Sequence, residues 1–201
     1  MTPVLAVEDP DLARSMLSLV FGFVQLDNGH MAFGDQSVAV VRIGELPDGM
    51  LRSPLDHVAF SIPDADEACA TFMARGGKLS RAFTPEGPKE ILEFWDHGVR
   101  FVFFDGPDGW PMEFCMKKGA KGSGRHDHFA IRTADLSVKE AQLGLLGGVA
   151  VARHVLCTES GTVNVSFIAI GLRMFELFDE GPYPAIEPDR GWIGFIPTAQ
   201  P

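Results

Sequence analysis

The chain is poor in cysteine and tyrosine and lacks any long uninterrupted apolar run. Its three cysteines lie far apart, with no CxxC spacing, at Cys69, Cys115 and Cys157. An odd number of scattered thiols argues against a disulfide framework and is typical of a reducing compartment. The longest apolar stretch, near residues 16–24, is interrupted by Ser18 and Gly22 and is too short to cross a bilayer. We therefore expect neither a membrane protein nor a disulfide-stabilised secreted one.

Basic residues are also in the minority. The chain has 17 lysines and arginines against 27 acidic residues, a formal net charge of −10. This balance argues against nucleic acid or an anionic membrane as the main partner. No basic segment precedes an apolar one at the N-terminus, so we expect no secretory signal and a cytoplasmic location. The sequence also lacks a P-loop, a dinucleotide fingerprint, a Ser-His-Asp order and a basic-aromatic nucleic-acid motif.

One pattern occurs three times along the chain. A short apolar strand is followed by an aspartate that can cap a helix, then by apolar residues at helical spacing, and then by a glycine that can end the helix. The apolar residues expected on the buried helix faces are Leu12, Met16, Leu19 and Val20, then Ala68, Phe72 and Met73, and then Leu136, Leu143 and Leu146. The three aspartate–glycine pairs are Asp9 and Gly22, Asp64 and Gly76, and Asp135 and Gly147. Strand-like segments follow each glycine, at 23–26, 30–33 and 38–43, at 79–83, 91–95, 99–104 and the strand with Glu113, and at 149–156, 163–170 and 173–178.

This repeat predicts an α+β fold built from three βαβββ modules. The modules are expected at residues 1–50, 55–117 and 126–180, with linkers near 44–54 and 117–124. Residues 181–201 contain five prolines, and we expect an irregular tail there.

The hairpin expected at residues 100–116 contains one unusual residue. Two apolar runs flank Asp-Gly-Pro-Asp-Gly at 105–109, which predicts two strands joined by a tight turn. On the second strand Glu113 interrupts the apolar sequence between Met112 and Phe114. A carboxylate buried there without a partner would be costly, so Glu113 either faces solvent or meets a cation.

Histidine and glutamate occupy matching positions in the second and third modules. His57 and His128 each open the first strand of a module, and Glu113 and Glu176 each lie on the last strand. Singly, a histidine at a strand end is more often bonded to a backbone carbonyl. Two imidazoles and two carboxylates at equivalent places favour a site for a divalent first-row metal.

These segments resemble the vicinal oxygen chelate superfamily over residues 2–180. The matching motifs are His-x-Ala-Phe-Ser-Ile at 57–62, Pro-Asp-Gly-Trp-Pro-Met-Glu at 107–113 and His-x-Ala-Ile at 128–131. The group includes glyoxalase I, extradiol dioxygenases, methylmalonyl-CoA epimerase and bleomycin-resistance proteins. The resemblance implies that the curved sheets of two modules pair into a cup that holds one divalent metal ion.

The set of two histidines and two glutamates is most similar to that of glyoxalase I. By this resemblance the chain is a metal-dependent lyase or isomerase, and its small substrate carries vicinal oxygens and passes through a metal-stabilised enediolate. The metal is Ni, Zn, Co, Fe or Mn. Glu176 is the expected base, with Glu113 as its symmetric partner, and the residues do not decide between the two.

Two alternative functions stay open at this stage. An Fe(II) extradiol dioxygenase would use two histidines and one glutamate and usually a nearby tyrosine, but the only tyrosine is Tyr183. A metal-free protein of the bleomycin-resistance type would only sequester a ligand. The first module departs from the family because Thr2 replaces the histidine and its last strand has no carboxylate. We expect it to serve for pairing, with a homodimer as one outcome.

Overall fold

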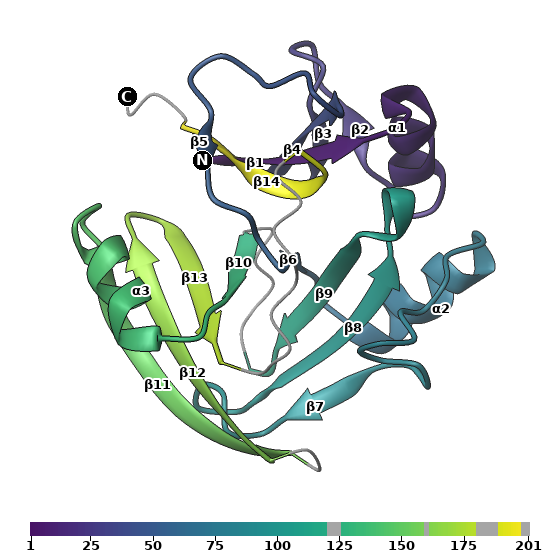
Figure 1. The fold of residues 1–201 in the computed structure, drawn as a ribbon. Helices are drawn as coiled ribbons and strands as arrows, with labels where there is room; N and C mark the ends of the chain where they lie inside the picture. The colour runs from purple at the N-terminus through teal and green to yellow at the C-terminus, as the bar shows by residue number, and fades with distance from the viewer. Residues whose placement is uncertain (120–125, 159–160, 180–188, 198–201) are drawn as a thin grey trace.

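Two curved sheets and three α-helices make up the described part of the computed structural model, which covers residues 1–119, 126–158, 161–179 and 189–197. The larger sheet has eight strands, in the spatial order β11 (Val149–Thr158), β12 (Gly161–Ile170), β13 (Arg173–Phe178), β10 (His126–Arg132), β6 (His57–Ser61), β9 (Pro111–Lys117), β8 (Val99–Asp105) and β7 (Lys89–Ile91). The smaller sheet has six, in the order β2 (Val24–Gln25), β3 (Met31–Phe33), β4 (Gln36–Arg42), β1 (Thr2–Val7), β14 (Gly191–Ile196) and β5 (Leu51–Arg52). The predicted α+β fold with curved sheets is confirmed (Figure 1).

The three helices begin and end where the sequence predicts. They are α1 (Pro10–Leu19), α2 (Ala65–Ala74) and α3 (Leu136–Gly144). The Asp9 carboxylate accepts hydrogen bonds from the backbone N–H groups of Asp11 and Leu12 at 3.0 and 3.1 Å. Asp64 and Asp135 cap their helices in the same way. The predicted stop glycines all have positive φ, 78° at Gly22, 90° at Gly76 and 83° at Gly147. An L-residue with a side chain would be strained there.

The predicted buried face of α1 is partly wrong. Leu12 and Leu19 are 68% and 74% exposed, whereas Ala13 and Leu17 face the core. A helix buries the face that neighbouring elements cover. In α1 the covered face is offset by one residue from the face that carries the leucines. The same error affects Met73 of α2 and Leu146 after α3, which are also exposed.

Two predicted strands of the second module are absent or short. Residues 79–83 form no strand apart from a bridge between Leu79 and Phe104, because the chain turns and Thr84 Oγ1 accepts the N–H of Phe103 at 2.8 Å. The segment 91–95 continues β7 only as far as Ile91. Trp95 then adopts a left-handed backbone conformation with φ of 57°, which no extended strand allows.

The predicted irregular tail is wrong for residues 191–196. These residues form β14, which lies between β1 and β5 and pairs antiparallel with both. No proline falls within β14, so its N–H groups can join the sheet. Trp192 is 2% exposed and donates its indole N–H to the carbonyl of Pro111 at 2.9 Å, so it is a core residue.

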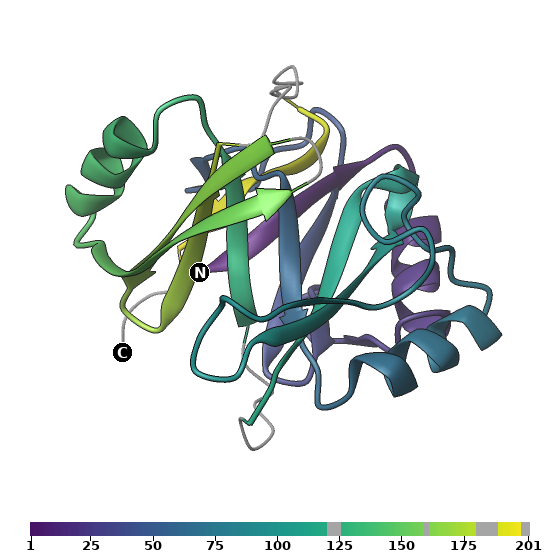
Figure 2. The same ribbon diagram turned by 90° about the horizontal axis from the view of Figure 1, so that it is seen from below.

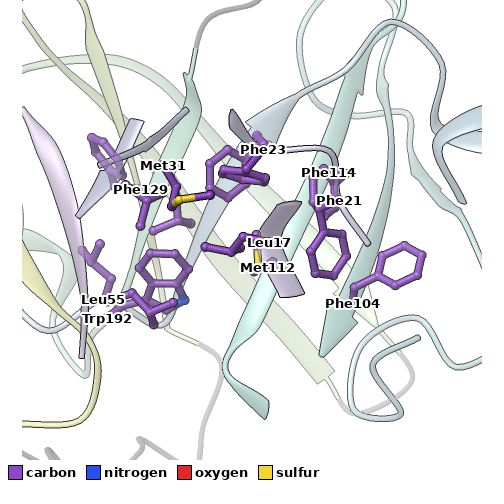
Figure 3. Close-up of a cluster of buried hydrophobic side chains, with 14 of the residues drawn as sticks. Leu17, Phe21, Phe23, Met31, Leu55, Phe104, Met112, Phe114, Phe129 and Trp192 are labelled. Carbon is purple, nitrogen blue, oxygen red and sulfur yellow. The ribbon is translucent and has the colours of Figure 1, made fainter. Parts of the chain in front are cut away.

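The main core lies between the two sheets. Figure 3 shows its central side chains, which include Leu17 of α1, Phe21 just after that helix, Trp192 of β14 and Phe129 of β10. The ring of Phe21 contacts the rings of Phe72, Phe104 and Phe114, with centroids 5.3 to 5.7 Å apart. In Figure 2 α1 and α2 lie side by side and α3 lies on the opposite side. The helices and the smaller sheet therefore cover one face of the eight-stranded sheet, and its concave face remains for a site.

The order strand, helix and three strands recurs three times, as predicted, although some of these strands are only two or three residues long. The exact module boundaries at residues 50, 55, 117 and 126 stay a prediction. Among the described helices none is long and apolar enough to cross a membrane.

Candidate metal centre

Four adjacent strands in the middle of the larger sheet carry the predicted ligands. In the pairing of β9, β6 and β10, Ala59 lies between Glu113 and His128. In the pairing of β6, β10 and β13, Ala130 lies between His57 and Glu176. Residues side by side in a sheet project from the same face, so all four functional side chains reach the concave surface. Each alanine leaves space above itself for an imidazole on one side and a carboxylate on the other.

The four side chains converge at their polar ends. His57 Nε2 and His128 Nε2 lie 3.4 Å apart, and Glu113 Oε2 lies 3.1 and 3.0 Å from them. Glu176 Oε2 is 3.0 Å from His128 Nε2 but 4.0 Å from His57 Nε2. The exposed fraction of each residue is 9% or less. The predicted constellation is therefore brought together, and Glu176 is its more loosely attached member.

The group fits a divalent metal ion by donor type, position and burial. The potential ligand atoms of His57, Glu113 and His128 lie within 4.8 Å of one another. Neutral imidazole nitrogen and carboxylate oxygen suit first-row ions. Two carboxylates this deeply buried need positive charge nearby, which a metal ion supplies and which protonated histidines supply in its absence. The metal's identity is unknown, and the individual ligand roles stay a prediction.

Asp56 and Arg132 support His57, and the sequence analysis missed both. Asp56 Oδ1 lies 2.8 Å from His57 Nδ1, and Arg132 binds Asp56 Oδ2 with Nη2 at 2.8 Å and Nε at 3.0 Å. A carboxylate only accepts hydrogen bonds, so His57 Nδ1 carries a proton and Nε2 points its lone pair at the cluster when the ring is neutral. Asp56 could have been predicted as a partner of His57, because it directly precedes that histidine in the sequence. Arg132 could not, because it lies far from both along the chain.

Burial and ion pairing displace the pKa values of two cluster residues in opposite directions. Burial alone would lower the pKa of His57, but hydrogen bonds to Asp56 and Glu113 outweigh it and raise the pKa from 6.5 to about 9. Burial alone would raise the pKa of Glu113, but His128 and His57 lower it from 4.5 to about 2. Burial alone would also raise the pKa of Asp56, but His57 and Arg132 outweigh it and lower the pKa. In the metal-free protein, protonated His57 therefore supplies the positive charge that compensates the buried carboxylates.

These displacements predict a pH dependence for the stability of the metal-free protein. The His57 pKa is raised on folding, so its contribution is complete below pH 6.5 and is lost as the pH rises through about 9. The Glu113 pKa is lowered, so its contribution is complete above pH 4.5 and is lost towards pH 2. Thermal unfolding in chelator should therefore show a melting temperature that falls between pH 6.5 and 9.5, by an amount that corresponds to a few kcal/mol at most.

The control for this prediction is the His57→Gln variant, which should lack most of the fall above pH 6.5. Saturating divalent metal should also reduce it, because a ligand imidazole is already deprotonated. An equally steep fall in wild type and variant would assign the effect to other groups.

The first module contains no equivalent cluster. Thr2 occupies the place of the histidine, and its hydroxyl pairs with that of Ser37 at 3.1 Å. The strand β4 has the sequence Gln-Ser-Val-Ala-Val-Val-Arg and so has no carboxylate. That this module binds no metal stays a prediction, and so does its role in pairing.

A cavity of about 150 Å³ opens above the His-Glu cluster. Aromatic residues line much of it, among them Trp95, Phe101, Phe103 and Phe167. Others, such as Phe60, are in the core between the sheets. Neither set is marked by residue type; strand alternation alone separates Phe103, on the concave face, from Phe104, which is in the core.

The single tyrosine and three further histidines either lie away from the cluster or fall outside the described residues. Tyr183 falls outside the described residues, and so does the side chain of His126. His154 lies on β11, where its ring contacts Phe94 at a centroid distance of 5.0 Å. His30 contacts Asn28 in the hairpin of the first module.

Comparison with known proteins finds likeness in structure only. No protein-family model and no curated protein sequence matches the chain. Glyoxalase I from Zea mays superposes with a TM-score of 0.66 and 15% identity, over 88% of this chain and 66% of the maize enzyme. A mutant of 4-hydroxymandelate synthase from Streptomyces coelicolor superposes with a TM-score of 0.56 and 16% identity, over 94% of this chain and 73% of the synthase. This chain therefore spans about two thirds of the maize enzyme, and the likeness concerns the fold.

Proposed function

Because the chain has the fold of the vicinal oxygen chelate superfamily and gathers two imidazoles and two carboxylates on its concave sheet, we propose that it is a metal-dependent lyase or isomerase of the glyoxalase type. Its substrate is a small molecule with oxygens on neighbouring carbons. The observation that carries the proposal is the second carboxylate: Glu176 lies 3.0 Å from His128, in addition to the group formed by His57, Glu113 and His128. A site with two histidines and one carboxylate would not need it.

A divalent ion held by these residues would supply Lewis-acid stabilisation of negative charge on two neighbouring substrate oxygens. Glu176 then takes the proton from the carbon beside the carbonyl and returns it to the adjacent carbon, so the substrate is isomerised without a redox partner. Its looser attachment to the two histidines supports this role over that of Glu113, which contacts both at about the same distance. Asp56 and Arg132 keep the ring of His57 oriented, and the aromatic walls exclude water.

Hydrogen exchange on an α-hydroxy ketone tests this proposal without knowledge of the natural substrate. We expect the metal-loaded protein to exchange deuterium from D2O into the hydroxyl-bearing carbon of 2-hydroxyacetophenone, with NMR as the measurement. The chelator-treated protein should exchange it no faster than buffer. If Ni, Zn, Co, Fe and Mn all fail to raise the rate above the metal-free control, the proposed isomerase chemistry is wrong.

The same preparations distinguish the two alternative functions. An Fe(II) dioxygenase would consume oxygen with catechols, and we expect no such uptake. A protein that only sequesters a ligand would bind that ligand equally well with chelator present and after replacement of His57 or His128. We further propose that the first module serves pairing between copies, which sedimentation would reveal as a homodimer.

A further inference from the structure

The cavity above the cluster is almost wholly apolar. Apart from the four cluster residues, its described lining consists of the Cys115 thiol and twelve apolar side chains, six of them phenylalanines. No lysine or arginine is among these residues. Two basic groups contact lining rings: Lys117 lies 4.7 Å from the ring centroid of Trp95, and Arg132, which binds Asp56, lies 5.1 Å from that of Phe178. A negatively charged substituent placed in this cavity would lose its hydration without gaining an ion pair from any of the described lining residues.

The cavity size suits one ring. An apolar protein cavity of about 150 Å³ stays dry and accepts benzene, and the cavity here has about that volume. The lining also presents ring faces at several orientations. Phe83 is stacked on Phe103 at 4.4 Å, while Trp95 is tilted against Phe167 at 4.9 Å. Offset and edge contacts with such walls stabilise an aromatic group beyond the burial of its area.

One loop lines the cavity and connects two of the modules. After β7 the chain leaves the sheet, and Phe94 and Trp95 extend to Phe167 on β12, at centroid distances of 5.1 and 4.9 Å. This joins the second module to the third across the concave face; in Figure 1 β7 and β11 mark the two edges of the curved sheet. Trp95 keeps a left-handed backbone, with φ of 57°, which is uncommon for a bulky residue and is typical of constrained functional loops.

We propose that the substrate carries an uncharged, ring-sized apolar group, most suitably a phenyl ring, next to its vicinal oxygens, and that Trp95 determines this specificity. The vicinal oxygens in this proposal rest on the proposed function, whereas the apolar ring is inferred from the cavity lining alone. It separates this protein from enzymes whose substrates carry a large anionic carrier, because no described residue of the cavity would hold such a carrier.

Three hydroxamates test the proposal by binding alone. They share one chelating group and differ in the substituent: acetohydroxamate has a methyl, benzohydroxamate a phenyl, and 4-carboxybenzohydroxamate a phenyl with a negative charge. Calorimetry with the metal-loaded protein should give benzohydroxamate a Kd roughly 10 to 100 times lower than that of acetohydroxamate. The carboxylated compound should lose most of this advantage.

Variants of the loop locate the effect. Trp95→Gly removes the ring at a backbone position that glycine adopts easily, and it should reduce the preference for phenyl roughly tenfold without changing acetohydroxamate binding. Phe101→Ala, on β8, is a second variant with the same expected result if Trp95→Gly unfolds. Leu92→Ala changes a 65% exposed residue of the same loop and serves as the control that keeps the preference.

The outcomes separate the two proposals. If the three hydroxamates bind equally, or if the carboxylated compound binds best, the ring proposal is overturned while chelation at the metal stands. If none binds to protein with a full complement of metal, the chelate chemistry of the proposed function fails, and the ring proposal falls with it. A preference for phenyl that neither Trp95→Gly nor Phe101→Ala reduces would place the ring outside this cavity.

Discussion

A His128→Ala protein is expected to retain no more than roughly a tenth of the divalent metal that the wild type holds after the same loading and desalting. His128 Nε2 is the shared neighbour of both carboxylates, at 3.0 Å from each, and it also lies 3.4 Å from His57. Its removal leaves Glu113 with one imidazole and Glu176 with none within hydrogen-bonding distance. Elemental analysis gives the metal content per chain, and about one ion is expected for the wild type.

The matched control for this experiment is His154→Ala. His154 lies on β11 of the same sheet, outside the cluster, so the same chemical change should leave the metal content as in the wild type. Asp56→Asn should give an intermediate result, because loss of a carboxylate that orients a ligand histidine typically weakens metal binding 10- to 100-fold. A His128→Ala protein with a full metal content and an unchanged melting temperature would show that the metal is held elsewhere.

Glu176→Gln is expected to leave the metal bound and to lower the rate of deuterium exchange by about 10²- to 10⁴-fold, the usual contribution of a general base. Glu113→Gln should show the opposite order, with metal loss as the primary defect. The reason is the asymmetry in the site: Glu113 is close to both imidazoles, whereas Glu176 is close to only one and has the more exposed side chain, 12% against 7%. Metal content and exchange rate, measured on the same samples, distinguish ligand from base.

The assignment of the two glutamates would be reversed if Glu113→Gln kept its metal and lost exchange while Glu176→Gln lost the metal. It would be wrong for both if each variant kept metal and exchange together. Since glutamine has nearly the volume of glutamate, neither substitution creates a cavity, and the melting temperature of each metal-loaded variant verifies that the cluster is still formed.

Local signals were the reliable part of the prediction. The caps at Asp9, Asp64 and Asp135 depend on a side chain and the backbone N–H groups two or three residues later. The stops at the glycines depend on one backbone conformation. Such interactions involve neighbours in the sequence, so a single sequence contains all the information they need.

Predictions failed where distant parts of the chain compete for the same space. Leu12 and Leu19 are apolar and helical but exposed, since the smaller sheet and the turn at Pro107–Gly109 contact a different face of α1. The segment 191–196 was predicted to be irregular but forms β14, because the edge of β1 offers it hydrogen bonds. No local sequence pattern in β1 or in the proline-containing tail predicts that pairing.

A single sequence was sufficient to predict the recurring strand, helix and hairpin order, the α+β class and the matched set of His57, Glu113, His128 and Glu176. How these groups meet follows from the folded chain: the register that sets Ala59 and Ala130 between them, the support of His57 by Asp56 and Arg132, and the aromatic cavity that Trp95 helps to line. The difference between the two lies in the sequence separation of the interacting residues. Caps, turns and alternation arise within a few residues. Register and cavity shape depend instead on strands that are far apart in the sequence, with 46 positions between Ala130 and Glu176 and 54 between Ala59 and Glu113. The pairing of such strands minimises the energy of the whole fold.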